Sequence, residues 1–188
     1  ILNLTKITPN KINYIKLDTN TLTCWEKKTA PLKKFRVGFV YNGRLSSFIE
    51  KYIELEKYKL LADLDIELIC IHRKSEIIDD IKNISFSDKI IYYDLDKDKP
   101  FCDTIHLLKN IDLLITVDTY MVHLAGIMKI KTWLLLGVCE WRWSNDEHKT
   151  YWYDSVEIIR SKKDESLDTV LPVVKDKLIK YMDTQNNQ

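Results

Sequence analysis

The sequence predicts an α/β fold, built on a doubly wound parallel sheet with helices on both faces. Short, continuously apolar runs alternate along the chain with segments whose apolar residues recur at helical spacing. Strands of that continuous kind occur in sheets that are covered on both faces. Only four glycines and four prolines interrupt the 188 residues, so most of the chain should form regular structure.

Three strands and three helices are predicted in the first part of this alternation. The apolar runs predict strands at 36–41 (RVGFVY), 66–71 (IELICI) and 89–95 (KIIYYDL). The helical spacing predicts helices at 47–61, 75–83 and 104–110. Ser75 should open the second helix and Asp103 should cap the third, because short polar side chains accept hydrogen bonds from the free N–H groups of a first turn.

The alternation continues toward the end of the chain. Strands are predicted at 112–117 (DLLITV), 132–138 (TWLLLGV) and 156–160 (VEIIR). Helices are predicted at 119–128 and from Leu167 to Met182. Residues 1–30 break the rhythm, so we interpret them as a lead-in or linker and not as the first unit of the sheet.

The charges nearly balance, with 29 lysines and arginines against 28 aspartates and glutamates. This balance gives no support to a nucleic-acid platform or a membrane-surface patch. No apolar run approaches the ~20 residues of a membrane span, and no signal peptide is expected. The four cysteines lack zinc-ligand spacing, which predicts reduced side chains and a cytoplasmic setting. Because the chain begins at Ile1 and not at Met, we expect it to be a piece of a longer protein.

Ligands of such sheets bind outside the carboxyl ends of the strands, beside helix N-termini. The residues that stand at those ends are Asn42, Gly43, Arg44, His72, Arg73, Asp94, Asp118, Thr119 and the stretch 137–143. The most distinctive segment is ITVDTYMVHLAG, residues 115–126, in which a strand leads directly into a helix. Gly126 at its end should let that helix pack closely on the sheet.

The turn between this strand and this helix predicts an anion site suited to phosphate. The backbone N–H groups of Thr119, Tyr120 and Met121 should point outward and carry the partial positive charge of the helix. His123 lies four residues after Thr119, so both side chains share one helix face. The alternative is structural: Asp118 caps the helix and His123 packs in the core.

A cluster of aromatic residues follows the strand predicted at 132–138. Its members are Trp141, Trp143, Tyr151, Trp152 and Tyr153, with Arg142 between the first two. Exposed tryptophans mark binding surfaces, so the cluster is a candidate binding surface. The alternative is a small apolar cluster that covers the end of the sheet, with an arginine that only stacks on the indoles.

The segment YYDLDKDKP, residues 92–100, offers a different chemistry. Its Asp94-x-Asp96 is superficially like a metal-binding motif or the nucleophile loop of haloacid dehalogenases. The dehalogenase pattern requires Thr or Val two residues after the second aspartate, where this chain has Asp98. A solvated acidic turn is the preferred interpretation, and no nucleophile loop supports a phosphatase.

Several of these motifs together carry a resemblance to a known family. The stretch DTIHLLKNIDLLITVDTYMVHLAGIMKIKTWLLL, followed by EWRW and YWY, resembles the C-terminal half of bacterial heptosyltransferase-like glycosyltransferases. It is most similar to the versions associated with tetratricopeptide repeats. The similarity runs from FRVGFVYNG, residues 35–43, to VEIIR, residues 156–160. It implies the nucleotide-sugar-binding half of the two-Rossmann-domain (GT-B) architecture.

The resemblance also implies a role for each matching residue. Thr119, Tyr120 and His123 would meet the diphosphate of the donor, and His123 would stabilise the leaving group. Asp118 would shape the loop. The other implied contacts are Asn42, Gly43 and Arg44 at the phosphates, Ile71, His72, Arg73 and Glu76 at the base and ribose, and Trp141, Arg142 and Trp143 beside the donor sugar. No metal and no cofactor other than the donor is implied.

The chain departs from the family in several places. GRLSSFIEKYIEL replaces a polar set that usually follows the first strand, His72 stands where glutamine is frequent, and Lys74 replaces a frequent glycine. The acceptor and its general base would come from an N-terminal acceptor-binding domain, with or without tetratricopeptide repeats. The implied organisation is 1–34 as a closing segment plus linker, 35–165 as the nucleotide-sugar-binding domain, and 166–188 as the C-terminal helix and tail.

The sequence therefore predicts the donor-binding half of a metal-independent glycosyltransferase. It would move a sugar from a nucleotide-diphosphate sugar to an acceptor that is a glycan, a lipid-linked sugar or a protein. The VDTYMVHLAG and WRW segments favour this function. The altered loop at 43–52 favours the alternative, a catalytically silent module that binds a nucleotide or a protein partner.

Overall fold

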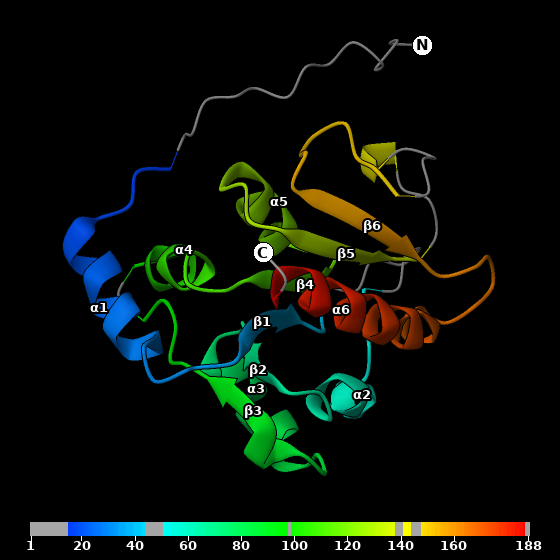
Figure 1. Cartoon of the computed structure of the whole chain (residues 1–188), viewed down its shortest axis with the longest axis horizontal. Helices are drawn as coiled ribbons and strands as arrows, with labels where there is room; N and C mark the ends of the chain where they lie inside the picture. Colours follow the sequence, from blue (N-terminus) through cyan, green and yellow to red (C-terminus); the bar gives the residue numbers. More distant parts are fainter. Residues whose placement is uncertain (1–14, 44–50, 98, 138–140, 144–147, 187–188) are drawn as a thin grey trace.

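The computed structural model describes residues 15–43, 51–97, 99–137, 141–143 and 148–186. Its centre is a sheet in which six strands of these residues pair in parallel, in the order β3-β2-β1-β4-β5-β6 (Figure 1). The strands are β1 (Phe35–Val40), β2 (Ile66–Cys70), β3 (Ile90–Tyr92), β4 (Leu113–Val117), β5 (Thr132–Leu136) and β6 (Val156–Arg160). The predicted fold class, a doubly wound α/β sheet, is confirmed.

The helices cover the sheet on both faces, as the continuous apolar strands require. They are α1 (Thr19–Thr29), α2 (Lys59–Ala62), α3 (Lys74–Lys82), α4 (Cys102–Leu108), α5 (Tyr120–Ile127) and α6 (Leu171–Asn186), with 3₁₀ turns at Leu55–Tyr58, Ser87–Lys89, Trp141–Trp143 and Leu167–Val170. Residues of α2, α3 and α6 share one core cluster with Phe39 and Ile115 of the sheet. Residues of α1, α4 and α5 share a second cluster with Ile69 and Leu114.

The order of the strands reverses between β1 and β4. The chain runs from β1 outward through β2 to β3, then returns to place β4 on the other side of β1 (Figure 1). Neighbouring loops leave the carboxyl edge in opposite directions at such a point, which opens a crevice between them. The fold therefore places a candidate ligand site where β1 and β4 end.

Helix α1 packs on this domain although its residues do not follow the sequence rhythm. It lies beside α4 (Figure 1), and its Trp25 is fully buried. The Trp25 indole N–H donates to Asp103 Oδ1 at 3.1 Å, and the ring meets Tyr93 edge-on at 5.2 Å. The division of the chain at residue 34 stays a prediction, but the described part of the lead-in contributes to the core.

The helix predicted at 47–61 is wrong at residues 51–54 and is confirmed only at its end, in α2. Tyr52 forms an antiparallel bridge with Asn42, the Gly43 N–H donates to the Lys51 carbonyl at 2.7 Å, and Ile53 N–H bonds Tyr41 O at 2.8 Å. Helical structure begins only at the 3₁₀ turn from Leu55 and continues into α2. Extended backbone is preferred here because these hydrogen bonds pair backbone N–H and C=O groups just after β1. The same conformation buries Ile53.

The predicted helix caps also differ from those observed. Helix α3 begins at Lys74 with Arg73 as its N-cap, so Ser75 does not open it. Helix α4 begins one residue before Asp103, which lies in its first turn. The N–H groups of Asp103 and Thr104 donate to Asp96 Oδ1, while Asp96 N–H donates to Asp103 Oδ2. Asp96 is therefore a structural cap and not a purely solvated residue.

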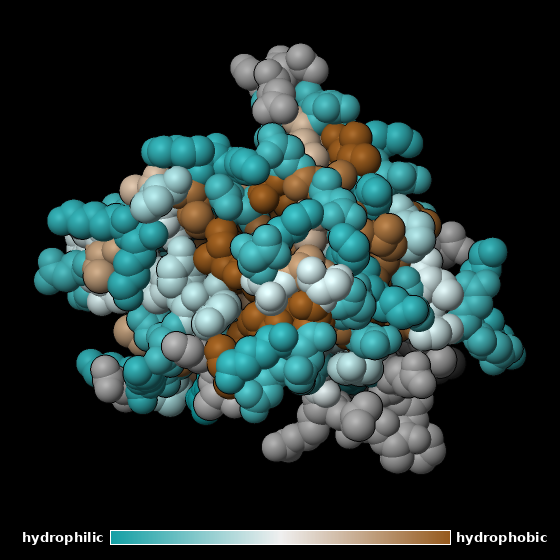
Figure 2. Space-filling model, turned by 90° about the horizontal axis from the view of Figure 1, so that it is seen from below, coloured by the Kyte–Doolittle hydropathy of each residue, from teal (hydrophilic) through white to brown (hydrophobic). Residues whose placement is uncertain are grey.

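Hydrophilic residues cover most of the face shown in Figure 2, and hydrophobic residues show mainly in recesses between them. This surface agrees with the nearly balanced charge of the chain. Among the described residues, no helix is long and apolar enough to cross a membrane. Cys24, Cys70 and Cys102 have free thiols, and Cys139 lies outside the described residues.

Candidate functional site

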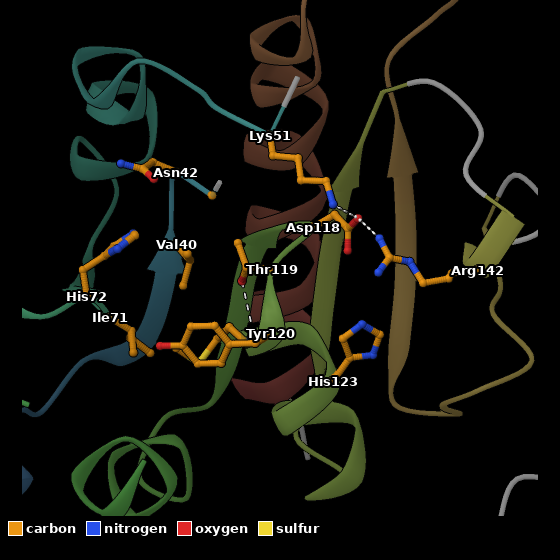
Figure 3. A pocket seen from close by; sticks show the side chains of 12 residues that line it. Val40, Asn42, Lys51, Ile71, His72, Asp118, Thr119, Tyr120, His123 and Arg142 are labelled. Atoms are coloured by element: carbon orange, nitrogen blue, oxygen red, sulfur yellow. Dashed lines mark hydrogen bonds and ion pairs between the residues drawn. The ribbon is translucent and has the colours of Figure 1, made fainter. Parts of the chain in front are cut away.

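A cavity of about 800 Å³ opens at the carboxyl edge of the sheet, at the point between β1 and β4 where the strand order reverses (Figure 3). Its lining consists of Val40, Asn42, Gly43, Lys51, Ile71, His72, Asp118, Thr119, Tyr120, Met121, His123 and Arg142. Nine of these residues are among the site residues singled out in the sequence. The volume lies within the 300–1,000 Å³ of typical small-molecule sites.

The other predicted site residues are placed differently. Trp143 is fully buried behind the cavity, and Arg73 caps α3 outside the lining. Arg44 lies outside the described residues, as do the side chains of Glu76 and Trp141. The sequence reasoning missed Lys51, which lines the cavity next to Gly43.

Asp118 is the electrostatic centre of the site. Its side chain is only 3% exposed, and Oδ2 lies 2.7 Å from Lys51 Nζ and 3.0 Å from Arg142 Nη2 (Figure 3). Among the described residues, two cations lie against this one carboxylate, so their local charge is positive. Burial strengthens the field of that charge, so the cavity favours an anionic ligand.

The N-terminus of α5 forms the floor of the same region. Thr119 is its N-cap, with extended backbone, and its Oγ1 accepts the Met121 N–H at 3.1 Å. The predicted availability of the Met121 amide is therefore wrong, because the cap already uses it. The structural alternative for Asp118 is also wrong, since Thr119 caps the helix while Asp118 pairs with the two cations.

His123 lines the cavity and is half-buried. Its Nδ1 lies 3.1 Å from the Tyr153 hydroxyl, and its ring stacks on Trp143 with centroids 5.2 Å apart. Burial lowers the pKa of His123, Arg142 and Lys51 lower it further, and Asp118 opposes them. His123 is therefore neutral at neutral pH, and a neutral imidazole can donate one hydrogen bond to a ligand and accept another.

Two members of the aromatic cluster, Trp143 and Tyr153, contact His123. Trp143 is buried against His123, whereas Tyr151 and Trp152 remain exposed. A Cβ at Gly126 would overlap the ring of Tyr153. The small size of Gly126 therefore makes room for the Tyr153 ring, and its predicted role in packing on the sheet stays a prediction.

His72 lies on the opposite side of the cavity, where β2 ends. Its ring packs against Tyr41 with centroids 4.9 Å apart, and its buried Nε2 has no hydrogen-bond partner within the part of the chain that the structure describes. Burial lowers the pKa of His72 to about 4, so it is also neutral at neutral pH. The Tyr41 hydroxyl in turn donates to Asp80 Oδ2 at 2.5 Å, which fixes the ring under His72.

No cluster of metal-ligating side chains occurs among the described residues. Asp94 pairs with Lys97 at 2.6 Å, and Asp96 accepts hydrogen bonds from the first turn of α4. The Asp94-x-Asp96 motif therefore contributes to the connection into α4 and lies outside the cavity lining.

Solved structures of glycosyltransferases share this fold. A family 9 glycosyl transferase from Veillonella parvula DSM 2008 aligns with a TM-score of 0.59 at 11% identity, over 90% of this chain and 52% of that one. E. coli ADP-heptose LPS heptosyltransferase II aligns with a TM-score of 0.60 at 12% identity, over 89% and 54%. E. coli heptosyltransferase WaaC with ADP-2-deoxy-2-fluoro heptose aligns with a TM-score of 0.54 at 13% identity, over 86% and 45%.

The chain thus spans about half the length of the structures it matches. It has the Rossmann-like architecture of one half of GT-B heptosyltransferases. At these identities the likeness is one of fold. No protein-family model matches the sequence, and no curated protein matches it either.

Proposed function

We propose that this chain is the donor-binding half of a glycosyltransferase that uses a nucleotide-diphosphate sugar. The observation that carries the proposal is the cationic cavity at the strand reversal, where Lys51 and Arg142 flank the N-terminus of α5. A diphosphate matches such a site, because two cations and a helix N-terminus together stabilise concentrated negative charge. The structural likeness to family 9 glycosyltransferases supports this choice among phosphate ligands.

In the proposed reaction, the bond between the sugar's anomeric carbon and the diphosphate breaks as an acceptor oxygen attacks that carbon. Negative charge grows on the departing diphosphate, so groups that bind that charge lower the barrier. Lys51 and Arg142 supply positive charge, and neutral His123 can donate one N–H. Asp118 holds both cations in place and keeps them oriented toward the cavity.

The acceptor and the general base are assigned to a second domain. The relatives of known structure are about twice as long as the part that this chain matches, which leaves room for such a domain. Its acceptor would lie against the open side of the cavity. Association with tetratricopeptide repeats and a cytoplasmic location stay predictions from the sequence.

A module that binds nucleotide without transferring a sugar is the alternative. The packing of His123 favours it, because the ring is engaged by Trp143 and Tyr153 as a structural histidine would be. Both functions need the diphosphate site, but only the glycosyltransferase consumes the sugar donor. Release of nucleoside diphosphate from a donor in the presence of the full-length protein distinguishes them.

The direct test is calorimetric titration of the chain with ADP, UDP and GDP. We expect saturable binding of at least one of them, and Arg142→Gln should weaken it about tenfold or more, since a charge-assisted hydrogen bond contributes ~1.5–3 kcal/mol. Arg36→Gln is the matched control. Arg36 also pairs with an aspartate, Asp112, at 2.9 Å and similar exposure, but at the opposite edge of the sheet.

Two results would contradict the proposal. One is the absence of binding of all three diphosphates at millimolar concentration. The other is an equal loss of affinity in Arg142→Gln and Arg36→Gln, because that result would place the ligand away from the cavity.

A further inference from the structure

The two sides of the cavity differ in chemistry. Lys51, Asp118 and Arg142 stand on one side, and Val40 and Ile71 lie on the other (Figure 3). The first side is charged, and the second carries no charge: it is apolar apart from Asn42 and the neutral histidine at the end of β2 (Figure 3). A nucleoside diphosphate has the same division, with charged phosphates at one end and an aromatic base at the other.

Tyr120 lies between the two sides. It is the first residue of α5, and its ring extends toward Ile71 in Figure 3. The residue lines the cavity and is 54% exposed. Exposed aromatic rings next to a cavity are the usual stacking partners of bases.

Phe101 contacts that ring. The two rings meet edge to face, with centroids 5.2 Å apart and planes at 62°. Phe101 itself is 47% exposed and has a φ of 62°, in the left-handed region that non-glycine residues rarely adopt. Strained, exposed residues of this kind cluster at ligand-binding features, and the strained residue here contacts Tyr120.

We propose that the Tyr120 ring, positioned by Phe101, is the stacking face for the base of a nucleoside diphosphate. This inference rests on the proposed function. It assigns the base to the Tyr120 side chain and leaves the phosphates to the backbone at the start of α5. The phosphates face Lys51 and Arg142, and the base lies over the tyrosine ring toward Ile71. Stacking tolerates different bases, so Tyr120 contributes affinity for a base without selecting which one.

The test compares two ligands that share the phosphates and differ in the base. The first ligand is whichever of ADP, UDP and GDP binds most tightly, and the second is inorganic pyrophosphate. Each is titrated into the wild-type chain and into Tyr120→Leu. The variant should bind the nucleotide about tenfold more weakly, while its affinity for pyrophosphate changes less than about twofold. Tyr120→Phe keeps the ring and should retain nucleotide affinity.

Phe101→Leu tests the positioning role. It should weaken nucleotide binding less than Tyr120→Leu does and leave pyrophosphate binding unchanged. Tyr151→Leu is the matched control, because Tyr151 is also an exposed tyrosine, at 41%, but does not line the cavity. It should leave both affinities unchanged.

The outcomes separate this inference from the proposed function. Equal weakening of both ligands by Tyr120→Leu, or tighter nucleotide binding, would overturn the stacking role and leave the diphosphate site intact. An unchanged nucleotide affinity would do the same. Failure of the wild-type chain to bind any of the three diphosphates would overturn both proposals.

Discussion

Two aspartates that each pair with two basic side chains differ in how deeply they are buried. Asp118 and Asp63 each pair with two basic side chains, Asp63 with Lys59 and Lys89. Asp63 is half-exposed, so water screens its pairs and they contribute little. Asp118 is enclosed, and its loss leaves two cations at the cavity without their common counter-charge.

We therefore expect Asp118→Asn to lower the free energy of unfolding by about 2–3 kcal/mol, because it breaks two ion pairs to a buried oxygen. Asp63→Asn should lower it by less than about 1 kcal/mol. Urea unfolding of both variants at neutral pH measures the difference. Equal losses of unfolding free energy in the two variants would mean that water screens the ion pairs of Asp118 as much as it screens those of Asp63.

Single residues show where the sequence was informative. Asp118, Thr119 and His123 could be placed at the site because a strand and a helix meet at them, and local periodicity identifies both. Lys51 could not, because its role depends on an extended connection that folds back along the end of β1. No local pattern signals that contact.

At the scale of elements, α5 and the segment around Tyr153 are shaped to fit each other. Gly126 in α5 leaves the space that the Tyr153 ring fills, and the Tyr153 hydroxyl meets His123 one turn earlier. The same contact orients the imidazole at the cavity. Packing between these two elements thus sets the geometry of a site residue.

Gly126→Ala tests that packing. Alanine in a helix interior normally stabilises a protein by up to ~1 kcal/mol relative to glycine. Here we expect a loss of about 1–3 kcal/mol, because the new methyl group overlaps the tyrosine ring. In a Tyr153→Ala background the same substitution should become neutral or stabilising, which a thermal-unfolding double-mutant cycle measures. Stabilisation in the wild-type background would show that the ring moves aside freely.

The helices and strands could be predicted from the sequence where burial of apolar side chains determines the local structure. The strands follow from continuous apolar runs, and each predicted strand overlaps an observed one. The segment 47–61 misled because Ile53 and Leu55 fill the core from extended and 3₁₀ backbone, whereas Tyr52 is 47% exposed. The α4 cap was missed because its acceptor, Asp96, lies seven residues before Asp103.

At the scale of the whole molecule, α1 extends the layer that α4 and α5 form on one face of the sheet. Its Trp25 belongs to the same core cluster as Met121 and Ala125 of α5. The described part of the lead-in therefore stabilises the layer on which the site is built.

Trp25→Ala should lower the free energy of unfolding by about 3–5 kcal/mol, as expected for the loss of a fully buried tryptophan. Trp152→Ala serves as the comparison: Trp152 is 40% exposed and donates one indole hydrogen bond to the Arg142 carbonyl, so its removal should cost about 1–2 kcal/mol. Denaturant unfolding measures both. A small effect of Trp25→Ala would mean that α1 is not part of the cooperative unit.

The central claim is that a nucleoside diphosphate binds where the strand order reverses. A crystal structure of the chain with its tightest-binding diphosphate tests it most directly. We expect the phosphates within hydrogen-bond distance of Lys51 and Arg142 at the start of α5, and the base against Tyr120. Phosphates bound at any other place on the chain, with this cavity left to solvent, would contradict the claim.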